Sequence, residues 1–175
     1  MRSAPYQADI AAGSSGGLLD LRAAPAAASS IEQAMGVRLP ATVGRIERSG
    51  SLAILALGPD HWLLRVSRYS EQEQYVRLEH AIGSGHGMVT VVSHAYVSYS
   101  VVGGGAVDVL AQGCPLDFDA TIFPVGTCAA SVLARGDVLL IRDSAGFELL
   151  VDRTHASYIW KWLLAAGGSE ALQNV

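Results

Sequence analysis

Few residues of this sequence have the types and the spacing that catalysis requires. Ser93 and His94 would pair a nucleophile with a base, but adjacent residues of a strand point to opposite faces and cannot hydrogen-bond in that way. Cys114 follows Gly113, which is expected to end a helix, so its thiol lies at the end of the helix dipole that does not activate it. We therefore expect a structural role for Ser93 and buried packing for Cys114 and Cys128.

The remaining candidates for a ligand or metal site are no stronger. Gly103–Gly105 precede a short helix, but they lack both the GxGxxG spacing and the Lys-Ser/Thr pair of a phosphate loop, and they predict a tight turn. The five histidines show no HxH or HxxxH spacing, and two cysteines alone cannot hold a structural zinc ion. Asp117 and Asp119 are paired carboxylates in a loop and are expected to form turns. The sequence predicts no catalytic, cofactor-binding or metal-binding residue.

Composition points instead to an interaction surface. Half of the 175 residues are hydrophobic and only 16% are charged, against about 25% in an average soluble domain. No run approaches the roughly 18 apolar residues of a transmembrane helix, so we favour apolar surface covered by a partner over a weakly charged monomer. The first residues show no secretory signal, which gives a cytoplasmic expectation, and the scattered basic residues predict no nucleic-acid binding.

The first half of the chain predicts the order strand, helix, hairpin, helix after a flexible tail over residues 1–17. The expected elements are a strand at 18–22, a helix from Pro25 to about Met35, a hairpin of 51–57 and 61–66 around Gly58-Pro59-Asp60, and a helix to about Ile82 opened by the capping-box pair Ser70 and Glu73.

The second half repeats this order. Its expected elements are strands within 88–102 with a break near His94, a helix at 106–112, strands at 129–134, 138–142 and 147–151, and a helix to about Ala166 capped by Asp152 or Thr154. We therefore predict an α+β fold of two repeated half-units, 18–83 and 88–167, which close one domain over 18–167 with antiparallel or mixed sheets. Residues 168–175 are expected to form a C-terminal tail.

The final expected helix is apolar on nearly every side. One face (Ile159, Leu163 and their neighbours) suits the chain's own sheet, and a second face consists of Tyr158, Trp162 and Ala165. Tyr and Trp are enriched at protein interfaces, so these three residues are the candidate partner surface. The alternative, that both faces are buried within the chain, stays open.

Five motifs in order give the chain a family resemblance. They are LGPDHWLL (57–64), VVSHAYVSYSVVG (91–103), GCPLDF (113–118), FPVGTC (123–128) and FELLVDRTHASYIWKWLLAAG (147–167). Together they resemble the gamma subunit of heterotetrameric sarcosine oxidase, although Val91 stands where that family often has an acidic residue. The N-terminal third carries no such likeness.

The resemblance implies a fold like the folate-binding domain of glycine-cleavage T-protein. It also implies a complex with alpha, beta and delta subunits that demethylates sarcosine oxidatively to glycine and either transfers the methylene group to tetrahydrofolate or releases formaldehyde. FAD, FMN, NAD and tetrahydrofolate would lie on other subunits, and this chain would be a small non-catalytic companion packed chiefly on alpha, with a role in the assembly and stability of that subunit.

Three alternatives remain open from the sequence. The chain could be the equivalent subunit of a dehydrogenase for N-methylglutamate or another secondary amine, or a plain homodimer. It could also be a stand-alone folate-binding protein, for which Asp108, Asp117 and Glu148 are the candidate acidic residues.

Overall fold

The fold is that of a computed structural model, which describes residue 6 and residues 8–14 and 16–167. The expected C-terminal tail, 168–175, lies outside the described residues. The described chain divides into two compact units. The N-terminal unit is formed by Ser15–His94 with Gly126–Cys128, and the C-terminal unit by the described parts of Met1–Ser14, Ala95–Val125 and Ala129–Val175.

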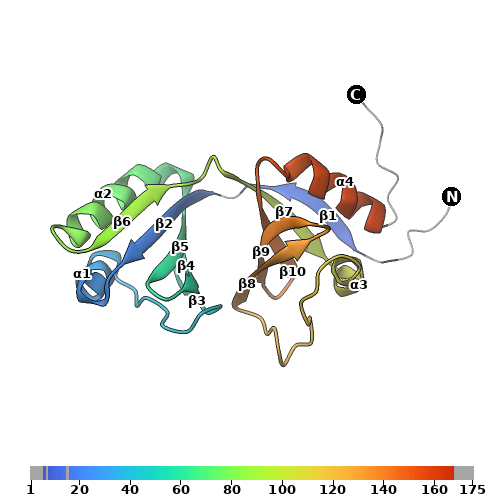
Figure 1. The fold of residues 1–175 in the computed structure, drawn as a ribbon, viewed down its shortest axis with the longest axis horizontal. Helices are drawn as coiled ribbons and strands as arrows, with labels where there is room; N and C mark the ends of the chain where they lie inside the picture. Colours follow the sequence, from blue (N-terminus) through green and yellow to red (C-terminus); the bar gives the residue numbers. More distant parts are fainter. Residues whose placement is uncertain (1–5, 7, 15, 168–175) are drawn as a thin grey trace. The chain divides into compact units, whose positions relative to one another are not determined.

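Each unit contains one five-stranded sheet, in the orders β3-β4-β5-β2-β6 and β1-β7-β10-β9-β8 (Figure 1). The first half of the chain supplies β1 (Asp9–Gly13), β2 (Gly17–Ala23), α1 (Pro25–Met35), β3 (Ile46–Ser49), β4 (Leu52–Gly58), β5 (His61–Val66), the short 3₁₀ helix η1 (Arg68–Ser70) and α2 (Glu71–Ile82). The second half supplies β6 (Gly87–Val91), β7 (Tyr96–Val102), α3 (Ala106–Ala111), β8 (Thr127–Leu133), β9 (Gly136–Arg142), β10 (Gly146–Asp152) and α4 (Ala156–Ala166). The fold class is α+β with two antiparallel sheets, as predicted.

The two halves of the sequence exchange their first strands. β1 pairs antiparallel with β7 in the C-terminal unit, and β6, its counterpart in the second half, pairs antiparallel with β2 in the N-terminal unit. The strands of the two halves correspond in chain order, β1 with β6, β2 with β7 and so on to β5 with β10. If each strand of one sheet is replaced by its counterpart, the result is the order of the other sheet read in reverse. Each sheet therefore takes four strands from one half of the sequence and one from the other.

For the described residues Asp9–Gly13, the exchange corrects the expectation of a flexible tail over residues 1–17, while residues 1–5, 7 and 15 of that tail lie outside the described residues. Asp9–Gly13 form an edge strand whose register runs from Asp9 opposite Val102 to Gly13 opposite Ser98. The segment gave little sign of this because four of its five residues are exposed, and it is held by backbone pairing with β7 and by the contact of Ile10 with the core.

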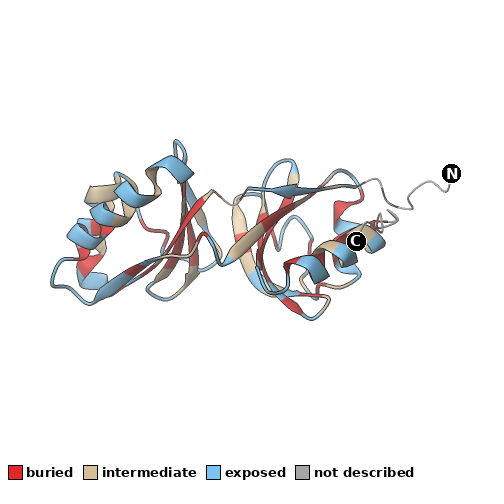
Figure 2. Ribbon diagram, turned by 90° about the horizontal axis from the view of Figure 1, so that it is seen from above, coloured by how far each residue is buried: buried red, intermediate tan, exposed pale blue. Residues whose placement is uncertain are grey.

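Apolar side chains join the helices to one face of each sheet. In the N-terminal unit Leu19 and Leu21 pack with Ile31 of α1 and with Leu78 and Ile82 of α2. In the C-terminal unit the corresponding core is formed by residues of β7, β9, β10, α3 and α4, among them Val101, Leu110, Leu140, Leu149, Ile159 and Leu163. In both units, buried residues follow the strands and the inner sides of the helices (Figure 2).

Most predicted element positions are confirmed, but two predicted helix caps are wrong: the capping box of α2, and the cap of α4 by Asp152 or Thr154, since His155 precedes α4 and no side chain caps it. Pro25 opens α1, and Gly36 ends it with a φ of 67°, a conformation that favours glycine. Ser70 precedes α2 but makes no side-chain cap, since its hydroxyl donates to the Ser67 carbonyl at 3.1 Å. The η1 turn before α2, with the Ser67 hydroxyl accepting from the Tyr69 amide, takes the place of the predicted box. β3 was not predicted at all.

Candidate functional site

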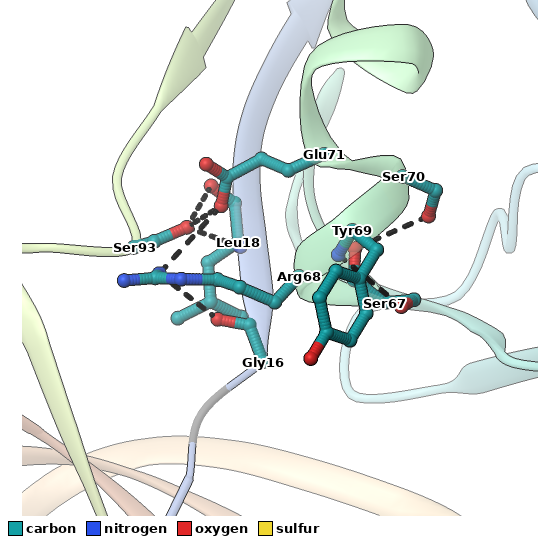
Figure 3. Close-up of polar contacts among 8 residues, drawn as sticks. All are labelled: Gly16, Leu18, Ser67, Arg68, Tyr69, Ser70, Glu71 and Ser93. Carbon is teal, nitrogen blue, oxygen red and sulfur yellow. Dashed lines mark hydrogen bonds and ion pairs between the residues drawn. The ribbon is translucent and has the colours of Figure 1, made fainter.

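Ser93 lies in the connection between β6 and β7, at the centre of a polar cluster (Figure 3). Its side chain is only 2% exposed. The hydroxyl accepts a 2.7 Å hydrogen bond from the Leu18 amide and donates to the Glu71 carboxylate. The one proton of the hydroxyl is therefore held by a carboxylate, while His94 is exposed beside it. Ser93 ties this connection to β2 and α2, which is the structural role expected for it.

Glu71 reaches the cluster because the chain around it is closely packed. A Cβ on Gly17 would come within 3.0 Å of the Glu71 carboxylate, so only glycine leaves room for that side chain. Arg68 lies 3.8 Å from the same carboxylate and donates to the Gly16 carbonyl at 3.4 Å. Three separate chain segments are thereby fastened at the place where β2 begins.

A second polar pair lies on the sheet of the N-terminal unit. His61 Nε2 is 2.7 Å from an Asp20 carboxylate oxygen, and Arg22 lies 3.7 Å from the other oxygen. Neighbouring strands β2 and β5 hold these side chains, with His61 directly opposite Arg22. Among the described residues no group of three or more His, Cys, Asp or Glu is placed to hold a metal ion.

Both cysteines are buried and free, as the packing prediction required. Burial raises the pKa of the Cys128 thiol from its ordinary value of 9.0 to about 11. The Cys114 sulfur lies 3.6 Å from the Ser131 hydroxyl. A raised pKa keeps the Cys128 thiol neutral, which is the opposite of what a nucleophile needs.

The paired carboxylates form turns, as predicted. Asp117 accepts from the Asp119 amide at 2.9 Å, and Asp119 accepts from the amide and the hydroxyl of Thr121 at 2.8 and 2.6 Å. The two hydrogen bonds from Thr121 lower the pKa of Asp119. Asp152 accepts in the same way from Thr154, whose hydrogen bonds lower the pKa of Asp152 just before α4.

The three acidic residues considered for folate lie on three different elements. Asp108 is in the first turn of α3, Asp117 is in the loop after that helix, and Glu148 is on β10. Glu148 accepts a 2.6 Å hydrogen bond from Ser98, so it and Asp117 both serve local structure. Gly103–Gly105 form the turn before the six-residue α3.

The candidate partner face of α4 is divided by the structure. Trp162 is half-buried, and a Cβ on Gly113 would lie 2.5 Å from its ring, so this side chain packs closely on its own unit. Tyr158 is 48% exposed with its hydroxyl donating to the Ala134 carbonyl, and Ala165 is exposed. Tyr158 and Ala165 remain available to a partner, whereas Trp162 already has an intrachain contact.

A shallow groove between α1 and α2 was not predicted. Its volume is about 460 Å³, and its lining includes Gln33, Val76 and His80. Arg77 crosses it and donates to the Ala34 carbonyl at 2.5 Å near the end of α1. The residue types on these helices gave no signal of a groove, because the packing of their side chains decides its depth.

None of the described helices is long and apolar enough to cross a bilayer.

Comparison with known proteins decides the family. The model of the sarcosine oxidase gamma subunit family matches residues 20–169, which is most of the chain. The chain belongs to this family. No curated protein sequence gives a significant match.

Solved structures agree with the family. A chain of the heterotetrameric sarcosine oxidase from Corynebacterium sp. U-96, in complex with pyrrole 2-carboxylate, superposes with a TM-score of 0.85 at 28% identity, over 95% of this chain and 88% of that one. The glycine cleavage aminomethyltransferase T of Bartonella henselae shares the fold, with a TM-score of 0.69 at 17% identity over 95% of this chain. This chain spans 48% of that protein, about half its length. The regulatory subunit of aspartate kinase from Thermus thermophilus gives 0.52 at 12% identity, over 90% and 97% of the two chains.

Proposed function

We propose that this gamma-family chain is a non-catalytic subunit that stabilises the alpha subunit of a heterotetrameric sarcosine oxidase-type complex. The complex would convert sarcosine to glycine in the cytoplasm, with transfer of the methylene group to tetrahydrofolate or its release as formaldehyde. FAD, FMN, NAD and tetrahydrofolate would be held by its partners, the alpha, beta and delta subunits.

The observation that carries the proposal is the match along nearly the whole chain to a subunit-sized chain of a solved heterotetramer. The polar side chains support a non-catalytic role. The Ser93 hydroxyl, the Asp119 carboxylate and Glu148 each make hydrogen bonds that stabilise the fold. The buried, neutral Cys128 thiol also supports a non-catalytic role, because a nucleophile needs a lowered pKa.

The proposal is tested by expressing this chain together with the alpha, beta and delta subunits of its complex, and by omitting it from a parallel preparation. With the chain present we expect a stable heterotetramer that oxidises sarcosine. Without it we expect alpha to aggregate or to lose thermal stability, because a surface meant for gamma is exposed. Equal yield, stability and turnover in both preparations would contradict the stabilising role. Trials with N-methylglutamate and other secondary amines identify the substrate.

The isolated chain provides a second test. A stand-alone folate-binding protein would bind tetrahydrofolate by itself in isothermal titration calorimetry, and the proposed subunit would not. Folate binding by the isolated chain would favour the stand-alone alternative.

We further propose that Tyr158 and Ala165 on α4 face a partner subunit, with Trp162 supporting them from within. Tyr158→Ser is expected to weaken assembly about tenfold, since a half-exposed tyrosine at an interface contributes roughly 1 to 2 kcal/mol. Tyr69→Ser, on the fully exposed tyrosine of the N-terminal unit, is the matched control and should leave assembly unchanged. Tyr158→Phe separates the ring from its hydrogen bond to Ala134. Equal affinities for all these variants would remove α4 from the interface.

A further inference from the structure

Each half of the chain lacks one strand of its own sheet. β6, from the second half, is the outer strand beside β2, with Gly87–Val91 opposite residues 19–23. β1, from the first half, is the outer strand beside β7, with Asp9–Gly13 opposite residues 98–102. Each half therefore donates one antiparallel strand to the other half and accepts one in return.

The donated strands bring apolar side chains as well as backbone. Val89 of β6 is 7% exposed and belongs to the core of the N-terminal unit, together with Leu78 of α2. Ile10 of β1 packs on the core of the C-terminal unit, and its Cδ1 atom lies 2.6 Å from the position that a Cβ on Gly167 would take. Burial of these side chains makes each pairing more favourable than a backbone ladder alone.

Polar contacts fasten the segment that follows β6 to the first half of the chain. The Val92 amide donates to the Leu18 carbonyl at 2.9 Å, and the Ser93 hydroxyl accepts from the Leu18 amide at 2.7 Å. The same hydroxyl donates to Glu71 at the start of α2 (Figure 3). Ser93 is buried, so water competes little for these hydrogen bonds. The cluster at Ser93 thus joins the two halves of the sequence.

A further contact joins the second half of the chain to the N-terminal unit. Gly126–Cys128 belong to this unit, and the Cys128 amide donates to the Gly44 carbonyl at 2.8 Å. The φ of Gly44 is 83°, and a Cβ there would lie 2.9 Å from the Cys128 carbonyl oxygen, so this close approach requires glycine. The halves are therefore held together at places far apart in the sequence.

The covalent connection between the halves is short, and residues 83–87 are all exposed. The Gly85 amide donates to the carbonyl of Ile82, in α2, at 2.9 Å. The His86 carbonyl accepts from the Ala24 amide at 2.7 Å, beside the first pair of the β2–β6 ladder. A cut between Gly85 and His86 would therefore leave both hydrogen bonds in place.

We propose that residues 1–85 and 86–175 are reciprocal strand-donating partners, so that the fold persists as a non-covalent pair when the chain between them is cut. The partner that the edges of β2 and β7 accept is the other half of the same chain, which binds by antiparallel strand addition. The proposal concerns this chain alone, so it is tested without other subunits and its outcome does not depend on the proposed function.

The main test cuts the full chain in its folded state. The recognition sequence of a site-specific protease is inserted between Gly85 and His86, and the purified protein is cleaved under native conditions. We expect one species with the mass of the uncut chain in size-exclusion chromatography with light scattering, and an unchanged circular dichroism spectrum. The melting temperature should depend on protein concentration after cleavage, because the pair dissociates as it unfolds, whereas that of the uncut control should not.

A charge on β6 tests whether this strand joins the halves. Val89→Lys places an ammonium group in the apolar core and should raise the dissociation constant of the cleaved halves on the order of 100-fold or more. Thr90→Lys is the matched control, because Thr90 is exposed on the other face of the same strand, opposite Asp20, and should change that constant by less than about fivefold. Dilution of the cleaved proteins, followed by native mass spectrometry, measures both.

The strand β1 is tested in the same way. Ile10→Lys should raise the dissociation constant by about tenfold, because the half-buried Ile10 side chain packs on the core of the C-terminal unit. Ala11→Lys, at the next and exposed position of the strand, is its matched control and should have little effect.

Three results would overturn the proposal. The first is separate elution of the two fragments at micromolar concentration, or loss of the folded spectrum on cleavage. The second is a species of twice the mass of the chain, because the strands would then be exchanged between two copies. The third is equal affinity for each lysine variant and its control, since the exchanged strands would then not be what holds the halves together.

Discussion

Helices α2 and α4 occupy equivalent places in the two halves of the chain, yet their surfaces differ. Each follows the hairpin of its unit and covers the sheet through buried aliphatic residues, Leu78 and Ile82 in α2, Ile159 and Leu163 in α4. Most of the remaining residues of α2 are charged or polar, Glu73, Arg77 and Glu79 among them, whereas Lys161 is the one charged residue of α4.

With the proposed interface on α4, one topology would serve two purposes. α2 has an outer surface that water can solvate, and its Arg77 also holds the end of α1. α4 uses most of its circumference for apolar contact, both with its own unit through Trp162 and, as proposed, with a partner through Tyr158. The folding core is thus alike in the two units, and the proposed interaction surface lies on one of them.

The exchanged strand β1 provides the largest expected effect. Deletion of residues 1–13 should destabilise the C-terminal unit by about 3 kcal/mol, because a paired edge strand and the contact of Ile10 with the core are lost. Hydrogen exchange measured by mass spectrometry should show lost protection in β7 and β10 but not in β2 and β5. Equal loss in both units would mean that they do not keep separate stabilities.

The close packing of α4 gives the next effect. Gly113→Ala would place a Cβ 2.5 Å from the Trp162 ring and should lower the free energy of unfolding by about 2 kcal/mol. Gly104→Ala is the matched control, since no atom lies within 4 Å of its added Cβ. Chemical denaturation followed by tryptophan fluorescence measures both. An unchanged midpoint for Gly113→Ala would show that Trp162 can move aside and that α4 is less closely packed than described.

The polar cluster at Ser93 fastens Glu71, the first residue of α2, to the connection between β6 and β7. Ser93→Ala leaves the Glu71 carboxylate and the Leu18 amide without this partner and should cost about 1 to 2 kcal/mol. Ser100→Ala, which removes only an exposed 3.4 Å hydrogen bond, should change stability by less than about 0.5 kcal/mol. Thermal denaturation of the two variants compares them, and equal melting temperatures would rule out a stabilising role for the cluster.

The smallest effect concerns Cys128, which clusters with the N-terminal unit although it lies on β8. The pKa of its thiol in the folded protein, about 11, exceeds the ordinary value of 9.0, so folding favours the neutral thiol. The resulting contribution to the free energy of unfolding is fully present below pH 9. This contribution, on the order of 1 kcal/mol, is lost as pH rises from 9 to 11. Cys128→Ala should therefore show a shallower fall of unfolding free energy over that range than wild type does. A parallel fall in both proteins would place the alkaline sensitivity elsewhere.

Local patterns predicted the helices and strands well where a residue type strongly favours one backbone conformation. Pro25 and Gly36 bound α1, and apolar runs flanking turn residues gave the hairpins around Asp60 and Ala145. The capping box failed because Ser67, three residues earlier, opens a 3₁₀ turn that takes the Ser70 hydroxyl. A choice between two equally local hydrogen bonds is not visible in residue spacing.

The sequence by itself determined the α+β class, the repeat of strand, helix, hairpin and helix, and the apolar character of α4, since each follows from periodicity and from turn residues. The family could also be recognised from ordered motifs, and the match over residues 20–169 confirms it. Only the tertiary structure decided that β1 and β6 are exchanged, that Trp162 packs on Gly113, and that Ser93 meets Glu71. These features join residues far apart in the chain, and their free energy depends on distances that no local pattern contains.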